Sequence, residues 1–316
     1  MINYTVIIPI YNEEKNIDIL YQRLTKVLTL LKKKYELIFV NDGSYDQSLV
    51  KLIDLYKKDR RIKIINFSRN FGHQMAVSAG LRYAKGEVIV IIDADLQDPP
   101  ELLPKFFAKI DEGYDVVYAI RKKRKESLIM RLAYATYYRF LKAVADIDIP
   151  LDSGDFCVMR KKVVEAINLL PERNRFVRGI RAWVGFKQIG LEYERDRRYA
   201  GKSKYTLKKI MKLAFDGIFS FSYVPFKFMF YLGLFSLIFS FLGALFVFYM
   251  KFFTSHYNRV PGFATTVTLL IFIGGLQLFS MGIMGEYIKR IYDEVKGRPS
   301  YIIESAFGIK IENQND

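Results

Sequence analysis

The stretch Glu87 to Glu101, EVIVIIDADLQDPPE, narrows the choice of folds more than any other, because it joins an apolar strand to a cluster of acids. Five consecutive apolar residues, Val88 to Ile92, predict a strand buried on both faces, and such strands belong to parallel sheets. The acids then follow the carboxyl end of the strand, where ligands bind in open α/β sheets. We therefore expect chemistry at Asp93, Asp95, Gln97 and Asp98.

Two interpretations of the Asp-x-Asp pair are open. The pair offers hard oxygen ligands to Mg²⁺ or Mn²⁺, and a bound divalent ion neutralises a diphosphate. Alternatively, the acids cap the turn and the helix that follows Pro99 and Pro100, since Asp favours both places. The strand directly before the pair favours the metal.

Strand and helix patterns alternate along the first 120 residues. Strands are predicted at 5–11, 36–42, 62–67, 87–93 and 115–120, and helices near 14–33, 46–59, 73–85 and 100–113. This alternation predicts an α/β fold of βαβ units with a mostly parallel sheet. Neither GxGxxG nor GxxxxGK[ST] occurs, so the glycine-rich phosphate cradles of dinucleotide and P-loop proteins are not expected.

Polar residues also end the first two predicted strands, on the edge that carries the acids. Asp42 is suited to accept a hydrogen bond from a uracil N–H or a ribose hydroxyl, or else it caps the following helix. His73 comes at the start of a helix after Gly72, where a local polar contact is expected, and His256 is expected to be solvated.

Composition indicates contact with lipid. Hydrophobic residues make up 51% of the 316 residues and aromatic residues 16%, which is high for a soluble protein. The net charge of +16 suits nucleic acid, anionic lipid or phosphorylated substrates alike. The single cysteine, Cys157, excludes an intrachain disulfide and is expected to be a small strand residue. The apolar run Val6 to Ile10 is too short for a signal peptide, which predicts a cytosolic amino-terminal part.

Two uncharged runs, Phe228 to Met250 and Phe263 to Gly285, are long enough to cross a hydrocarbon core of about 30 Å. The short connection between them predicts a transmembrane hairpin over 228–285. Basic residues flank both outer ends, so the positive-inside rule places both termini in the cytosol. The second run contains Gly274, Gly275, Gly282 and Gly285, which either permit close packing between subunits or reflect ordinary tolerance of glycine.

Two basic amphipathic segments precede the hairpin. One helix is predicted at about 127–145 and another at 204–224, where Lys204, Lys208 and Lys212 recur every four residues. Both are expected to lie on the cytosolic membrane surface. The alternative for 204–224 is a soluble helix packed on the catalytic domain. No nucleic-acid-binding module surrounds either segment, so no nucleic-acid partner is predicted.

Six segments carry a family resemblance: VIIPIYNEE, FVNDGSYDQS, SRNFGHQMAVSAGL, DADLQDPPE, DSGDF and AGKSKY. Together they resemble family 2 glycosyltransferases of the GT-A fold over about residues 4–300. More narrowly, they resemble polyprenyl-phosphate glycosyltransferases, which include dolichyl-phosphate mannose synthases and bacterial undecaprenyl-phosphate glucosyltransferases. The resemblance implies transfer of a sugar from a nucleotide donor to a lipid phosphate.

The resemblance also implies roles for individual residues. The nucleotide would be bound by Pro9, Tyr11, Glu13, Val40 and Asp42, the donor by Asp93, and Mg²⁺ or Mn²⁺ by Asp95 and Gln97. Arg121 and Lys204 are candidates for the cations that face the leaving diphosphate, and Arg131 and Arg198 for those that bind the acceptor phosphate. Asp155 is the candidate catalytic base, with positioning as its rival role. A phosphate monoester with a second pKa of about 6 is already largely ionised and hardly needs a base.

The expected organisation is a catalytic domain at 1–203, a surface helix at 204–224, the hairpin at 228–285 and a cytosolic tail at 286–316, with a short strand near 300–303. The expected protein is an inverting transferase in the cell (inner or plasma) membrane that moves a single sugar, taken as glucose from UDP-glucose, onto undecaprenyl phosphate, and that forms a homo-oligomer. GDP-mannose or a UDP-aminopentose are alternative donors. A processive polysaccharide synthase is disfavoured because two spans are few for a polymer channel. The rival of another class is a non-catalytic scaffold for a lipid-sugar flippase.

Overall fold

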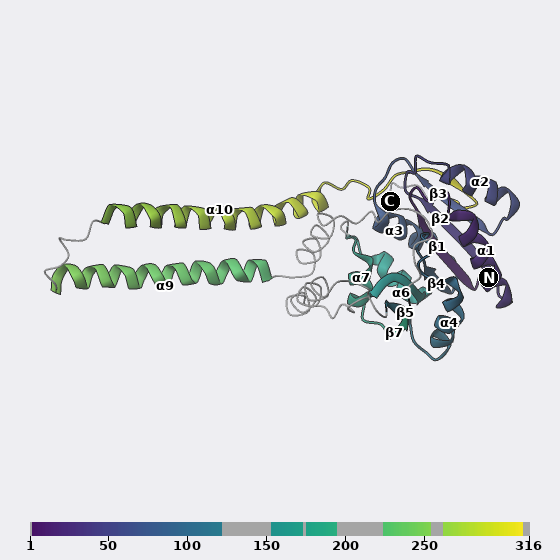
Figure 1. Ribbon diagram of the computed structural model, residues 1–316, viewed down its shortest axis with the longest axis horizontal. Coiled ribbons are helices and arrows are strands. Elements are labelled where there is room, and N and C mark those ends of the chain that lie inside the picture. Colours follow the sequence, from purple (N-terminus) through teal and green to yellow (C-terminus); the bar gives the residue numbers. More distant parts are fainter. Residues whose placement is uncertain (1, 122–152, 173–174, 195–223, 254–261, 312–316) are drawn as a thin grey trace. The chain divides into compact units, whose positions relative to one another are not determined.

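The computed structural model describes residues 2–121, 153–172, 175–194, 224–253 and 262–311 (Figure 1). They fall into two compact units, an α/β unit and a unit of two long helices. Both predicted interface helices lie in segments outside these residues, as do Arg131, Arg198, Lys204 and His256.

Within the described part of the chain, eight strands form one sheet in the order β7-β5-β6-β4-β1-β2-β3-β8. The strands are β1 Tyr4–Ile10, β2 Tyr35–Asn41, β3 Ile62–Phe67, β4 Val88–Ile91, β5 Val116–Arg121, β6 Ser153–Arg160, β7 Gln188–Tyr193 and β8 Ile303–Phe307. Strands β3, β2, β1 and β4 pair in parallel, and so do β5 and β7. Strands β6 and β8 run antiparallel to their neighbours. The prediction of a mostly parallel α/β sheet is confirmed.

Helices cover both faces of this sheet, because each presents one apolar stripe to it. They are α1 Ile17–Leu30, α2 Ser48–Lys58, α3 His73–Tyr83, η1 Pro100–Leu102, α4 Leu103–Asp111, α6 Lys161–Leu169 and α7 Val177–Trp183. Leu24 of α1, Leu52 of α2 and Phe106 of α4 belong to the core on one face. On the other face, Val77 of α3 and Val163 of α6 pack in a second core.

The strand ends that carry the polar residues all lie at one edge of the sheet. Strands β1, β2, β4 and β5 all end at this edge, and β6 begins there because it runs in the opposite direction. We call it the carboxyl edge. It brings together segments that lie far apart in the sequence, from Tyr11 to Asp155.

The predicted strand near 300–303 is displaced by a few residues. Strand β8 begins at Ile303 and pairs with β3 of the same chain, so this part of the expected tail completes the sheet of the α/β unit.

The second unit consists of α9 Val224–Phe253 and α10 Gly262–Val295, which lie side by side (Figure 1). Their stretches Phe226–Met250 and Leu269–Val295 are long and apolar enough to cross a membrane. Large apolar side chains on both helices are exposed, for example Phe235 and Leu270 at 65% each. Surfaces of this size and composition are suited to lipid rather than water.

Candidate active site

The turn after β4 places two acids at the carboxyl edge. Leu96 adopts a φ of 60°, in the left-handed region that is uncommon for a leucine. The Gln97 backbone N–H donates to Asp95 Oδ1 at 3.1 Å, which closes a tight turn. Asp95 therefore does shape the turn, as the capping interpretation predicts. This role leaves room for a metal, because a carboxylate has lone pairs for several partners.

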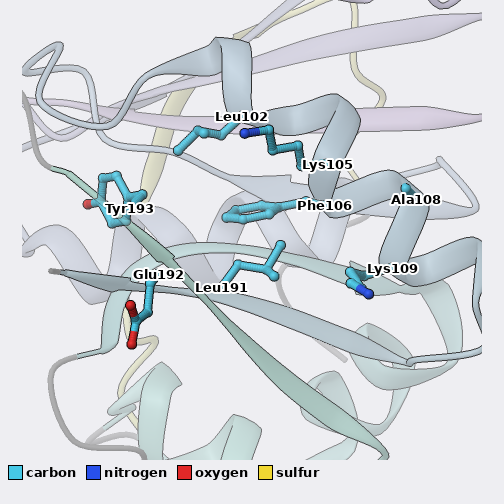
Figure 2. Close-up of a pocket in the computed structure, with 8 residues that line it drawn as sticks. All are labelled: Leu102, Lys105, Phe106, Ala108, Lys109, Leu191, Glu192 and Tyr193. Atoms are coloured by element: carbon cyan, nitrogen blue, oxygen red, sulfur yellow. The ribbon is translucent and has the colours of Figure 1, made fainter.

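Asp98 lies on the buried side of this turn and fixes it by a hydrogen bond. It is fully buried, and Tyr193 Oη donates a hydrogen bond to Asp98 Oδ1. Tyr193 ends β7 and also lines an open groove of about 330 Å³ between α4 and β7, where Phe106 and Leu191 face one another (Figure 2). Among the described residues, those predicted to bind the donor do not line this groove. Asp98 is thus an anchor of the turn.

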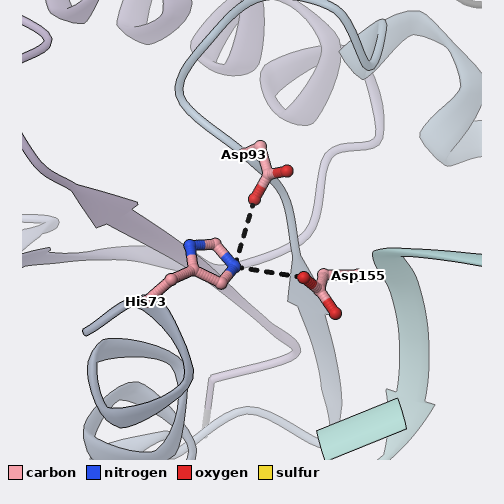
Figure 3. Close-up of side chains that lie close together, drawn as sticks. All are labelled: His73, Asp93 and Asp155. Carbon is pink, nitrogen blue, oxygen red and sulfur yellow. Dashed lines mark hydrogen bonds and ion pairs between the residues drawn. The ribbon is translucent and has the colours of Figure 1, made fainter. Parts of the chain in front are cut away.

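Three side chains from three elements meet at the carboxyl edge (Figure 3). His73, the first residue of α3, directs Nε2 toward Asp155 Oδ2 of β6 at 3.1 Å. The same nitrogen lies 3.6 Å from Asp93 Oδ1, which follows β4. The expected local contact of His73 is therefore wrong, because its partners lie 20 and 82 positions further along the sequence.

Asp155 is surrounded by hydrogen-bond donors. Arg178 of α7 binds it in a bidentate manner, through Nε at 2.6 Å and Nη2 at 3.1 Å. Gln74 Nε2 adds a contact at 3.4 Å, and Gln74 Oε1 accepts the Val177 N–H at 3.0 Å. The carboxylate is only 7% exposed, so these donors from α3 and α7 hold it in one orientation.

These contacts decide the charges in the cluster. Burial raises the pKa of Asp155, but Arg178 and His73 outweigh it and hold that pKa well below its usual range. Burial raises the pKa of Asp93 to about 6, helped by the neighbouring carboxylates and opposed by His73. For His73, burial lowers the pKa, but the carboxylates of Asp93 and Asp155 outweigh it and raise the pKa to about 9. At neutral pH the cluster thus pairs an imidazolium with an ionised Asp155.

The His73 contacts predict a pH dependence of stability in the metal-free protein. A pKa of about 9 in the folded state, against 6.5 for an ordinary histidine, stabilises the fold fully below pH 6.5. This contribution disappears as the pH rises through 9. We expect His73→Gln to lower the thermal unfolding midpoint most near pH 6, and hardly at all near pH 9.5. A deficit of equal size at both pH values would contradict the charge assignment.

Asp42 is the hub of a loop at the same edge. Asp42 Oδ1 accepts the backbone N–H groups of Phe71 and Gly72 at 2.6 and 3.1 Å, and Oδ2 accepts from Asn70 Nδ2 at 2.9 Å. Burial raises its pKa, while the loop amides oppose this shift. The helix-cap alternative is wrong, because α2 begins only at Ser48 and its preceding residue is Gln47.

The other residues expected at the nucleotide also reach this edge. Pro9 and Val40 are partners in the register of β1 and β2, and Arg121 is the last residue of β5. Tyr11 packs edge-to-face on Tyr45, with ring centroids 6.2 Å apart. Glu13 follows β1, and its backbone N–H donates to the Ser48 hydroxyl at 3.0 Å. The ends of β1 and β2 therefore form one continuous surface.

Sequence reasoning missed Gln74 as a member of the cluster, and it considered Arg178 only as one of several arginines near the entry for the acceptor. Gln74 could have been suspected, because a Gly-His-Gln sequence opens a helix at the ligand edge. Arg178 gives no such signal, since it is one of several arginines in its region and its partner lies 23 positions away.

The acids of the β4 turn fit a divalent cation. Asp93 Oδ1 is buried and accepts no hydrogen bond from the described residues, and burial, helped by the carboxylates of Asp155, Asp98 and Asp95, raises the pKa of Asp93. A cation would relieve both conditions. His73, Asp93 and Asp155 also place ligand atoms within 4.8 Å of one another. Because Arg178 and His73 already neutralise Asp155, the turn with Asp93, Asp95 and Gln97 has the greater need of a metal.

Comparisons with known proteins agree with this arrangement. Residues 5–167 match the model of glycosyl transferase family 2, and residues 224–291 match that of the GtrB C-terminal hairpin. An uncharacterized glycosyltransferase of Bacillus subtilis, YkcC, is 48% identical over 98% of this chain and 95% of its own length. A bactoprenol glucosyl transferase from an SfII prophage of Shigella flexneri is 38% identical over 96% of this chain and 97% of its own length.

The alignments with these relatives cover nearly the whole chain, and the two matched family models include part of the α/β unit and the two apolar helices of this chain. The chain belongs to glycosyl transferase family 2 and is a membrane-associated glycosyltransferase with the C-terminal hairpin of the GtrB type.

Proposed function

We propose that the protein transfers glucose from UDP-glucose to a polyprenyl phosphate, such as undecaprenyl phosphate, at the cytosolic face of the cell membrane. The observation that carries this proposal is the joint presence, on one chain, of the acid cluster at the carboxyl edge and the apolar hairpin. The name of the Shigella relatives, bactoprenol glucosyl transferase, supports the donor sugar and the lipid. A non-catalytic scaffold would need no such cluster.

In the proposed reaction, an oxygen of the lipid phosphate attacks the anomeric carbon of the glucose. The bond from that carbon to UDP breaks as the new bond forms, UDP leaves with the bonding electrons, and the configuration inverts. Mg²⁺ or Mn²⁺ held by Asp95 and Gln97, beside Asp93, would neutralise charge that develops on the leaving diphosphate. Pro9, Tyr11, Glu13, Val40 and Asp42 are proposed to bind the nucleotide, and Arg121 and Lys204 to face its phosphates.

Positioning is the role of Asp155 that the geometry supports. Its depressed pKa makes it a poor proton acceptor, and the ionised lipid phosphate carries little need for one. Arg178 and the His73 imidazolium offer positive charge beside Asp155, which suits an incoming phosphate. Arg131 and Arg198 remain proposed acceptor contacts.

The membrane arrangement is proposed with both termini in the cytosol, on the basis of the basic residues that flank the hairpin. A homo-oligomer is proposed as well. Within the described residues, a Cβ built at Gly274, Gly275, Gly282 or Gly285 would meet no atom within 4 Å, which leaves these positions open to a neighbouring helix.

Transfer of labelled sugar tests the proposal directly. The full chain, purified in detergent, is mixed with undecaprenyl phosphate, Mg²⁺ and labelled UDP-glucose, GDP-mannose or a UDP-aminopentose in parallel. We expect lipid-soluble label with UDP-glucose, its loss with a chelator and its return with added Mg²⁺. Transfer from another donor alone would correct the sugar, and no transfer from any donor would favour the scaffold.

A further inference from the structure

Strand β8, the last strand in the described residues, reaches the carboxyl edge beside the Asp42 loop, which we define as residues 69–72. Strand β8 runs antiparallel to β3, from Ile64 paired with Phe307 to Phe67 paired with Ile303. Its first residues therefore lie where β3 ends. The pairing continues past the strand, because the Ser68 N–H donates to the Ile302 carbonyl at 3.1 Å.

Aromatic contacts continue from this strand into the loop. The ring of Tyr301 stacks on Phe67, with centroids 5.0 Å apart and planes 16° from parallel. Phe67 in turn meets Phe71 edge-to-face at 5.7 Å. Burial raises the pKa of Tyr301 to about 12, helped by the nearby Tyr83, which agrees with a partly buried ring packed against the core.

The loop is held from its other side by the end of β2. Asp42 accepts the amides of Phe71 and Gly72, as described above. Gly43 has a φ of 62°, and a Cβ built there would lie only 2.4 Å from the backbone carbon of Arg69. The Asp42 loop is thus contacted on one side by the end of β2 and on the other side by the stacked rings of Phe67 and Tyr301. It leads directly into His73 of the central cluster.

A polar connection runs parallel to the aromatic one. The β3–β8 register is irregular at Asn66, and there Asn66 Nδ2 donates to Glu304 Oε2 at 2.9 Å. Asn66 Oδ1 accepts from Asn41 Nδ2 at 2.7 Å, and Asn41 immediately precedes Asp42. Irregularities of this kind re-aim side chains near functional sites. Two separate sets of contacts therefore join β8 to the residue expected at the nucleotide.

We infer that Tyr301 is a positioning residue of the donor site. It acts through Phe67 and Phe71 to hold the Asp42 loop, so that Asp42 and His73 are already in place when the nucleotide sugar binds. The inference rests on the proposed function, which assigns Asp42 to the nucleotide. The segment from Lys296 to Ser300 is all that separates Tyr301 from the end of α10, so the chain that leaves the second membrane helix also completes the donor site.

Replacing Tyr301 by alanine in the full-length protein tests the inference. We expect KM for UDP-glucose and Kd for UDP to rise by about three- to tenfold, because the aromatic support of the loop is lost. The kcat is expected to stay within about twofold, since no reacting group is touched. Tyr301→Phe keeps the ring and is expected to restore both constants. If the alanine variant does not fold, Tyr301→Leu replaces it, with the same expectation.

Phe307→Ala is the matched control, because Phe307 packs on Tyr56 at the opposite end of the same strand, with centroids 5.9 Å apart. It weakens the docking of β8 without touching the carboxyl edge. Hydrogen exchange adds a measurement that needs no activity: the amides of Phe71 and Gly72 should lose protection in Tyr301→Ala and keep it in Phe307→Ala.

Failure of the inference and failure of the proposed function are separable. If the wild-type protein transfers no sugar, the proposed function is wrong, while UDP binding and amide exchange still test the loop. An unchanged Kd for UDP in Tyr301→Ala overturns the inference. An equal rise in Phe307→Ala also overturns it, because the effect would then come from strand docking in general.

Discussion

Asp95→Ala is expected to lower the rate of glucose transfer by about a thousandfold or more. The reason is the loss of the carboxylate that we propose to bind the metal at the leaving diphosphate, where a divalent ion would contribute several kcal/mol of charge stabilisation. The measurement is the initial rate of lipid-soluble label formation at saturating UDP-glucose and Mg²⁺.

Asp54→Ala is the matched control for this substitution. Asp54 lies on α2 in an exposed ion pair with Lys57 at 3.1 Å, so the same chemical change occurs away from the site. Its rate should stay near that of the wild type. Activity in Asp95→Ala close to the wild-type rate, with Mg²⁺ still required, would assign the metal to other residues, of which His73, Asp93 and Asp155 are the alternative group.

The second large effect on the rate is expected at Asp155. Replacing it by alanine and by asparagine distinguishes a positioning role from that of a catalytic base. Asp155→Ala is expected to lower kcat by about a hundredfold or more, because Arg178 and His73 lose the group that orients them. Asp155→Asn keeps an acceptor oxygen for Arg178 and is expected to stay within about tenfold of the wild type. The measurement is kcat for both variants, together with the thermal unfolding midpoint as a check of folding.

A catalytic base would behave differently. An asparagine cannot accept the proton, so Asp155→Asn would then fall as far as Asp155→Ala. Arg178→Lys extends the test, since a lysine keeps the charge but not the two-pronged geometry of the guanidinium. If positioning is the role of this pair, Arg178→Lys should lower kcat while the pH profile stays unchanged.

The sequence alone predicted strands β1 to β5, the helices α1 to α4 and the edge where the site lies, but it did not delimit β6, β7, α6 or α7. An apolar run such as Val88 to Ile92 predicts a strand that is buried on both faces of the sheet. The spacing of apolar residues in α1 predicts a helix with one buried face. Both signals are local, because they depend on the period of a strand or a helix and on the layer that covers it. The two apolar helices were predicted for the same reason, since each is a continuous stretch of sequence whose length and lack of charge can be read directly.

Only the tertiary structure decided the partners of the site residues. Asp155 comes to Asp93 because β6 runs antiparallel to β4 and so begins at the carboxyl edge. Arg178 meets Asp155 because α7 packs against β6, and no local pattern records that contact. The hydrogen-bond donors around Asp155 also lower its pKa, and this favours a positioning role over the role of a catalytic base.

The turn after β4, from Asp93 to Asp98, has both features that the sequence predicts and features that only the tertiary structure decides. Its residue types and its place after a buried strand are local features, so the sequence determined that a group of acids at a ligand edge would follow β4. Whether Asp98 faces the ligand or the core depends on Tyr193, which ends β7 at one edge of the sheet, three places from β4 in the strand order. The pairing of β8 with β3 likewise depends on contacts between residues more than 230 positions apart. Such contacts depend on the packing of whole elements, and only the folded chain brings them together.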